Sequence, residues 1–277
     1  MENGRMYLLE EKPIGRYRIN LNKIYKEEKE SFLYAKEIDP VQFIHINPNP
    51  GDREIIGFFA SQFAYGNIVA MTGFLKNLFL RLGKEPLAFI KKGDFSNLKG
   101  LYYRFHKEKE IIFLFRIVKR MVDEFGSIGG MVKHFYNGDI RKTLWDIRSH
   151  YFHKSNELLF FFPKPSKTNP LKRWNLYFRW MVRKDKIDTG IWDFIDKKDL
   201  IVPLDTHIFK IGRCLGWTKC KTPSYKAAWE ITEVLKTFSP EDPLKFDFFL
   251  CHRVGIDAKC PGRRTRACTN QCVLIKN

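Results

Sequence analysis

The spacing of apolar residues constrains this chain more than any other feature of its sequence. Apolar side chains recur every three and four residues in several long stretches, which is the period of a helix with one buried face. Strand-like alternation is nowhere sustained over more than a few residues. The helical stretches are Ile19–Ala35, Arg53–Tyr65, Ile68–Leu82, Glu110–Phe125, Asp139–Ile147 and Trp174–Val182. Turn-forming residues separate them, as in Gly126-Ser-Ile-Gly-Gly130, so the sequence predicts an all-α fold.

The charge of the chain points to an acidic partner. Its 277 residues include 49 Lys and Arg against 31 Asp and Glu, a formal net charge of +18. Such an excess attracts polyanions, so we expect nucleic acid as the partner. Genomic codon bias toward lysine is the alternative explanation of the excess. The basic residues are spread along the chain instead of lying beside an exposed amphipathic segment, so no membrane partner is expected.

Neither the N-terminal residues nor the apolar runs suggest export. Runs such as Ile111–Phe115 are far shorter than the roughly 20 residues that cross a bilayer. Residues Met1–Pro13 mix acidic and basic side chains and lack the apolar core of a secretory signal. We therefore expect a cytoplasmic protein, and no pattern indicates an obligate dimer, so a monomer is expected.

A lysine at the start of one predicted helix is a candidate nucleophile. The Pro- and Lys-rich segment Pro163–Pro170 cannot be regular helix, and it leads directly into Lys172 and a buried apolar stripe that ends at Val182. A helix N-terminus and neighbouring cations disfavour a protonated amine. Lys172 is therefore a candidate amine nucleophile, and a solvated lysine at a helix start is the alternative interpretation.

An aspartate follows an extended apolar run in the segment Leu200–Trp217. The run stops at Pro203, and a helix is expected to begin directly after Asp205. Asp205 is thus predicted to be an N-cap that accepts the amide of Ile208 or its neighbour, an interaction of about 1 kcal/mol. The open question from the residues alone is whether this carboxylate has any role beyond the cap.

These two segments carry a resemblance to a known superfamily. Leu204-Asp-Thr-His-Ile-Phe-Lys-Ile211 resembles the segment that holds the catalytic aspartate in the endonuclease III branch of the helix-hairpin-helix (HhH-GPD) DNA glycosylases. Most of the chain resembles an uncharacterised prokaryotic family of that superfamily, through Asp52-Arg-Glu-Ile-Ile-Gly-Phe58, Ala64-Tyr-Gly66, Lys172–Arg183 and Pro203–His207. The resemblance implies an N-terminal extension (1–45), a two-lobed helical glycosylase domain (46–258) and a cysteine-rich C-terminal segment (259–277).

The resemblance also implies base excision repair chemistry. In bifunctional members a lysine attacks the sugar C1′ and an aspartate assists departure of the base, roles that Lys172 and Asp205 match. The usual glycine-rich hairpin before the lysine is absent, because no glycine lies between Pro163 and Lys172. The spacing of 33 residues between the lysine and the aspartate resembles the archaeal 8-oxoguanine glycosylase branch. The implied activity is that of a DNA glycosylase and AP lyase, with an oxidised purine such as 8-oxoguanine as the damaged base.

Two other interpretations stay open at this point. A catalytically silent nucleic-acid-binding protein of the same fold would explain the missing hairpin. A monofunctional glycosylase would use water activated by Asp205, with Lys172 as a phosphate contact only.

Further residues are predicted to contact duplex DNA or the extruded base. A damaged nucleotide must leave the stack, which requires aromatic or apolar faces for the base and positive charge for the phosphates. The predicted DNA contacts are Lys164, Lys167, Arg173, His207, Arg263, Arg264 and Arg266. The predicted base pocket consists of Gln62, Phe63, Tyr65, Trp174 and Trp192, although each aromatic residue is also suited to a core.

The cysteines are concentrated near the C-terminal end of the chain. All six follow residue 213, and Cys251, Cys260, Cys268 and Cys272 have eight, seven and three residues between neighbours. Endonuclease III relatives carry a four-cysteine [4Fe–4S] cluster at this place, although their spacing differs. The resemblance therefore implies a [4Fe–4S] cluster on these four residues, with zinc or no metal as alternatives. Cys214 and Cys220 are interpreted as ordinary thiols.

Overall fold

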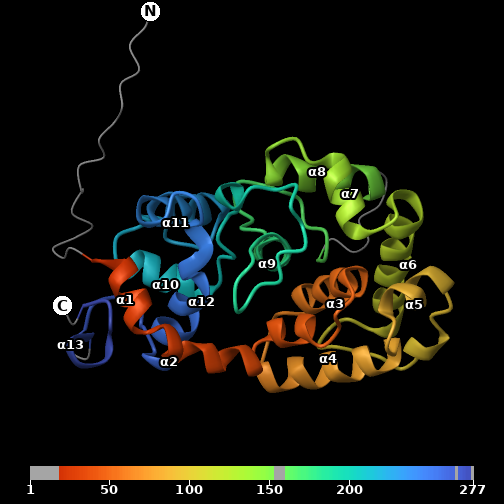
Figure 1. Cartoon of the computed structure of the whole chain (residues 1–277), viewed down its shortest axis with the longest axis horizontal. Coiled ribbons are helices and arrows are strands. Elements are labelled where there is room, and N and C mark those ends of the chain that lie inside the picture. Colours follow the sequence, from red (N-terminus) through yellow and green to blue (C-terminus); the bar gives the residue numbers. More distant parts are fainter. Residues whose placement is uncertain (1–18, 153–159, 266–267, 276–277) are drawn as a thin grey trace, which may run out of the picture.

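Helices account for the regular structure in the described part of the chain, residues 19–152, 160–265 and 268–275 of the computed structural model (Figure 1). No strand forms among these residues, and isolated bridges pair Tyr103 with His106 and Lys184 with Thr189. The predicted all-α class is therefore confirmed. None of the helices in these ranges is long and apolar enough to cross a membrane.

The helices follow one another with short connections. The α-helices are α1 (Leu21–Glu27), α2 (Lys29–Leu33), α3 (Pro50–Gln62), α4 (Ile68–Leu82), α5 (Pro86–Lys92), α6 (Glu108–Phe125), α7 (Ile128–Phe135), α8 (Ile140–Phe152), α9 (Lys172–Val182), α10 (Thr206–Cys214), α11 (Tyr225–Phe238), α12 (Asp247–Phe249) and α13 (Cys268–Gln271). Short 3-10 helices are η1 (Tyr34–Glu37), η2 (Pro40–His45), η3 (Ser96–Leu98), η4 (Lys197–Asp199) and η5 (Pro243–Phe246), and a π-helix, η6 (Leu250–Asp257), continues α12.

The strongly periodic stretches form helices close to where the spacing predicts them. Helix α4 begins after Asn67, whose side chain accepts the backbone N–H groups of Val69 and Ala70 at 2.9 and 3.2 Å. Helix α6 buries one apolar stripe and ends at Gly126, which takes a φ of 80° that glycine adopts without strain. In both helices the capping residues and the apolar periodicity indicate the same helix, so the local sequence is sufficient to predict it.

The stretch Ile19–Ala35 differs from its prediction because it is broken. Helices α1 and α2 meet at Glu28, and η1 follows at Tyr34. The hydroxyl of Ser31 donates to the Glu28 carbonyl at 2.7 Å, and the guanidinium of Arg253 holds the Glu28 carboxylate at 2.7 Å. Such side-chain bonds compete with a continuous helical ladder.

Helix α7 begins within a segment that the sequence predicts to be a turn, so that prediction is wrong for Gly129 and Gly130. Gly129 and Gly130, interpreted as turn residues, lie inside this helix, which begins after the N-cap Ser127. A Cβ atom on Gly129 would stand 2.4 Å from Glu54 Oε1 and 2.6 Å from Trp192 Nε1. Glycine is therefore present because α7 packs closely against α3, and not because the chain turns.

Helix α9 lies between two groups of helices (Figure 1). Helices α3 to α8 form one group, and α10 to α12 form the other together with α1 and α2. Helix α9 packs so closely on α3 that a Cβ atom on Gly57 would lie 2.8 Å from Met181 Cε. Phe32, in the region expected to be an N-terminal extension, is fully buried against Phe248 and Phe249. Helices α1 and α2 thus help to build the second group, whereas η2 packs on the first group, where the Phe43 ring contacts Phe79 of α4.

A buried ionic cluster attaches α9 to that second group. Arg179 binds Asp188 through Nε at 3.2 Å and also pairs with Asp247 at the start of α12. Arg183 pairs with Asp188 as well and binds Asp242 Oδ1 at 2.7 Å. Four of these five residues are almost completely buried, and Asp242 is about one-fifth exposed. Buried charges require such pairing, so the cluster fixes the orientation of α9.

Candidate functional site

A cleft of about 610 Å³ opens between the two helix groups. Its walls come from η1 and the start of η2, the segment that follows α3, the first turns of α9 and α10, and the π-helix η6. Lys172 and Asp205, the two residues predicted to be catalytic, both line it. The structure therefore brings together two side chains that lie 33 residues apart in the sequence.

Lys172 is the first residue of α9, as the sequence predicts. The preceding residue, Leu171, takes a left-handed conformation with a φ of 53°, and its side chain is buried. A residue other than glycine pays about 1–2 kcal/mol for this conformation. The carbonyl oxygen of Asn169's side chain accepts the Leu171 N–H at 2.9 Å and helps to hold it. Strain of this kind concentrates at functional sites, and here it precedes the candidate nucleophile.

The amine of Lys172 is directed along the end of α3. Its Nζ lies 3.5 Å from the Ala64 carbonyl oxygen, and the side chain is half-buried. Ala64 and Tyr65 also line the cleft. The amine therefore stands inside the cleft instead of projecting freely into solvent.

Asp205 is the N-cap of α10, and this prediction is confirmed. Its Oδ1 accepts the Ile208 N–H at 2.7 Å. Its Oδ2 accepts the thiol of Cys251 at 3.3 Å, and Cys251 belongs to the π-helix η6. Segments of π-helix are rare and occur often at functional sites. Both oxygens of the carboxylate are thus held in a defined orientation.

Other charged groups in the cleft were not identified from the sequence. Asp39 binds His252 at 3.2 Å, and Asp247 pairs with Arg179. Although burial acts to raise it, the pKa of Asp39 is lowered by the hydrogen bond from His252 and by the Val41 N–H. Burial raises the pKa of Asp247 despite its pairing with Arg179. No local motif marks these residues, because each depends on an element distant in sequence.

Of the predicted base-pocket residues, Tyr65 lines the cleft. Its ring packs on Phe160 with centroids 4.9 Å apart, and its hydroxyl has no hydrogen-bond partner among the described residues. Gln62 is fully buried at the end of α3, and its side-chain amide likewise has no partner there. Tyr65 therefore contributes to the lining of the cleft although its hydroxyl is buried, whereas Gln62 is enclosed by the protein.

The other three predicted base-pocket residues lie in the core. Phe63 is fully buried, and Trp174 and Trp192 are 2% and 3% exposed. The indole N–H of Trp174 donates to the Phe161 carbonyl at 2.9 Å, and that of Trp192 donates to Glu54 Oε1 at 2.8 Å. These interactions are structural, and the three side chains do not line the cleft.

The predicted DNA contacts are dispersed around the molecule. Lys164 and Lys167 are exposed in the loop before α9, and Lys164 lies 5.2 Å from the Trp145 ring. His207 lines the cleft. Arg173 instead stacks 3.7 Å from the Phe160 centroid and donates to the carbonyls of Gln62 and Phe160. Burial lowers the pKa of Arg173 to about 10, and the guanidinium is engaged within the protein.

The four cysteines predicted to bind metal do not lie together. Cys260, Cys268 and Cys272 line a second pocket, but Cys251 lies in the cleft beside Asp205. Burial and the neighbouring carboxylates raise the pKa of Cys251 well above its ordinary value, so it remains a neutral thiol donor. In the described part of the chain, no three Cys, His, Asp or Glu side chains are arranged to hold a metal ion. Arg263 and Arg264 are exposed near this pocket, and Arg266 lies outside the described residues.

The family of the chain follows from a comparison with family models. The model described as "Protein of unknown function (DUF2400)" matches residues 39–257. The chain belongs to this family. No curated protein and no solved structure matches the chain.

The DUF2400 region contains both Lys172 and Asp205. It also contains Cys214 and Cys251, and it ends before Cys260, Cys268 and Cys272. The candidate active site is therefore built mainly within the family region, with one wall from residues 34–38 just before it.

Proposed function

We propose that this protein is a DNA glycosylase with associated AP lyase activity, in which Lys172 is the nucleophile and Asp205 the assisting carboxylate. The observation that carries the proposal is that both residues line one cleft, each at the N-terminal end of its helix. A departing base leaves positive charge at the sugar C1′, which an amine can capture and a carboxylate can stabilise. A cleft that presents one of each meets this chemical requirement.

The reaction needs no redox partner. The Nζ lone pair of Lys172 bonds to C1′ while the bond from C1′ to the base nitrogen breaks, and the base departs with that electron pair and takes up a proton. The C1′–O4′ bond then opens, O4′ keeps the bonding electron pair and takes up a proton, and the amine gives up its two protons, which leaves an imine between Nζ and C1′. Loss of a proton from C2′ then expels the 3′ phosphate and cleaves the strand. The Asp205 carboxylate stabilises the developing positive charge.

The surroundings of the cleft support a nucleotide as the substrate class. Its volume of about 610 Å³ is large enough for an extruded nucleotide, and Tyr65 contributes to its lining. The net charge of +18 and the exposed Lys164 and Lys167 favour the phosphates of duplex DNA. We propose an HhH-GPD-like fold for the helical domain and a damaged base, such as an oxidised purine, as the group removed.

Borohydride trapping tests the proposal. Purified protein is incubated with labelled duplexes that contain 8-oxoguanine, uracil or an abasic site, with borohydride present. We expect a covalent adduct with the wild type, no adduct with Lys172→Gln, and a strongly reduced yield with Asp205→Asn. Lys91→Gln, at an exposed lysine of α5 that lies outside the cleft and is not among the predicted DNA contacts, is the control and should retain the adduct.

The other outcomes distinguish the alternatives. Base excision without a trapped adduct would indicate a monofunctional glycosylase that uses water. Tight, salt-dependent binding with neither excision nor an adduct on any lesion would indicate a catalytically silent binding protein. Either result would overturn the role of Lys172 as nucleophile.

A further inference from the structure

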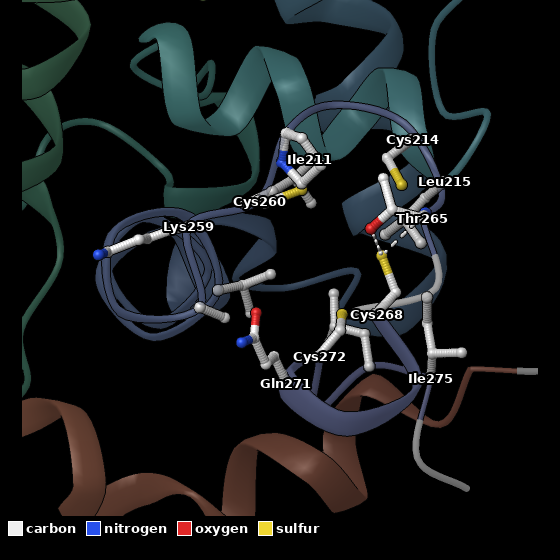
Figure 2. Close-up of a pocket in the computed structure, with 14 residues that line it drawn as sticks. Ile211, Cys214, Leu215, Lys259, Cys260, Thr265, Cys268, Gln271, Cys272 and Ile275 are labelled. Carbon is white, nitrogen blue, oxygen red and sulfur yellow. Dashed lines mark hydrogen bonds between the residues drawn. The ribbon is translucent and has the colours of Figure 1, made fainter.

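Four cysteines line one pocket near the C-terminal end of the described chain. The pocket has a volume of about 260 Å³, and its cysteines are Cys214, Cys260, Cys268 and Cys272. Figure 2 shows their sulfur atoms around the same space, with Cys214 reaching it from the end of α10. Apolar side chains complete the lining, among them Ile211, Leu215 and Ile275. The sequence spacing pointed to Cys251 as the fourth member, but the structure supplies Cys214 instead.

Backbone amides are directed at three of these sulfur atoms. The Thr265 N–H donates to Cys268 Sγ at 3.3 Å, as the dashed line in Figure 2 marks. The Gly262 N–H donates to Cys260, and the N–H groups of Leu274 and Ile275 donate to Cys272. Sulfur is a weak acceptor as a thiol and a much better one as a thiolate. Hydrogen bonds to sulfur also tune bound iron–sulfur clusters.

The loop that carries Cys260 is shaped by its approach to α10. Lys259 takes a left-handed conformation with a φ of 49°, and Gly262 takes a φ of 82°. A Cβ atom on Gly262 would lie 2.9 Å from Lys210 Cγ. Lys259 lines the pocket, and Lys210 acts electrostatically on Cys260. Lys210 is therefore a cation close to Cys260, whereas the Lys259 amine points away from the four sulfur atoms (Figure 2).

The remaining two cysteines are engaged elsewhere. Cys251 donates to Asp205 Oδ2 at 3.3 Å, and Cys220 donates to Glu230 Oε2 at 3.7 Å. Neither lines this pocket. They provide matched controls for the four that do.

The size of the pocket favours a cluster over a single ion. Zinc holds four thiolates at about 2.3 Å, which leaves no space between them. The pocket of about 260 Å³ is larger than the space that four thiolates enclose around one zinc ion. Four thiolates spread around a larger space suit a cubane of iron and sulfide.

We propose that Cys214, Cys260, Cys268 and Cys272 bind a [4Fe–4S] cluster, with Cys214 taking the position that the spacing assigns to Cys251. The cluster would join the end of α10, whose N-cap is Asp205, to the loop 258–265 and to α13. This site does not depend on the proposed glycosylase activity, because its ligands lie in a separate pocket. Its test therefore needs no DNA substrate.

Metal content tests the ligand set. The full-length protein is reconstituted anaerobically with ferrous iron and sulfide, desalted, and measured for iron, sulfide and visible absorbance. We expect about four iron and four sulfide per wild-type chain. Cys214→Ser should lose most of the bound iron, while Cys251→Ser and Cys220→Ser should retain it. Far-UV circular dichroism checks that each variant is folded.

Thiol labelling identifies the ligands without a substitution. Alkylation of the loaded and the metal-free wild type, followed by peptide mass spectrometry, should show that metal protects Cys214, Cys260, Cys268 and Cys272 and leaves the labelling of Cys220 and Cys251 unchanged. Protection of Cys251 in place of Cys214 would overturn the ligand set. Binding of one zinc per chain in preference to iron, or the absence of any bound metal after reconstitution, would overturn the cluster.

Discussion

The thiol of Cys251 donates to Asp205 Oδ2 at 3.3 Å, so this cysteine belongs to the candidate active site. With the Ile208 N–H on Oδ1, it holds the carboxylate in one orientation. We expect Cys251→Val to lower the single-turnover excision rate about five-fold, the kinetic equivalent of one hydrogen bond of about 1 kcal/mol. Cys251→Ser retains a donor and should restore the rate. A rate that is the same in all three proteins would show that Cys251 has no positioning role.

Asp205 has a structural role as the N-cap of α10, and two substitutions separate this role from its proposed chemical role. In Asp205→Asn the side-chain oxygen can still accept the Ile208 N–H, so the free energy of unfolding should change by less than about 0.5 kcal/mol. Asp205→Ala loses the cap and should lower it by about 1 kcal/mol. Both variants lose the charge, and excision should fall about 100-fold or more in each. Urea unfolding and single-turnover kinetics are the measurements.

Asp196 provides a matched control for this separation. It caps η4 by accepting the Lys198 N–H at 3.0 Å, and it does not line the cleft. Asp196→Asn should leave excision unchanged. An equal loss of excision in Asp196→Asn and Asp205→Asn would contradict a specific role for the Asp205 carboxylate.

Arg179 is the link between α9 and α12 whose loss should be most harmful to the fold. It pairs with Asp188 and Asp247, and its side chain is 4% exposed. Arg179→Met leaves two buried carboxylates without this partner and should lower the free energy of unfolding by about 3–5 kcal/mol. Lys142→Met removes an exposed pair with Asp146 and should cost less than about 1 kcal/mol. Similar losses in the two variants, measured by urea unfolding, would contradict this account.

Local sequence was sufficient for elements whose periodicity and caps agree. Helix α4 runs from Ile68 to Leu82 as its apolar spacing predicts, and Asp205 caps α10 as predicted. In contrast, Gly129 was predicted to lie in a turn. Its place inside α7 is explained only by its contact with Glu54, which lies 75 positions away in the sequence. A glycine required by close packing has the same local appearance as a glycine required by a turn.

The residues of the candidate site, like the helices, could be predicted only where a local sequence signal marks them. Lys172 and Asp205 carry recognisable local signals, a helix start after prolines and an N-cap, and the structure places both in the cleft. Spacing alone could not choose between Cys251 and Cys214, because the choice depends on which helix end faces the loop at Cys260. Asp39 was missed because its partner, His252, lies 213 residues away.

His106 should make the stability of the protein depend on pH. Both ring nitrogens are buried without a hydrogen-bond partner among the described residues, and Nδ1 lies 3.6 Å from Glu110 Oε2. Burial lowers the pKa of His106 below its ordinary value of 6.5, and Glu110 offsets only part of this shift. A histidine whose pKa is lower in the folded chain contributes stability that is fully present above the unfolded value and is lost as the pH falls through it. The free energy of unfolding should therefore decrease as the pH falls from about 7.5 to about 5.

The substitution His106→Phe tests this prediction. Its ring can still pack on Phe160 and Phe161, so urea unfolding across this pH range should show a shallower decrease. A slope equal to that of the wild type would mean that other groups cause the pH dependence.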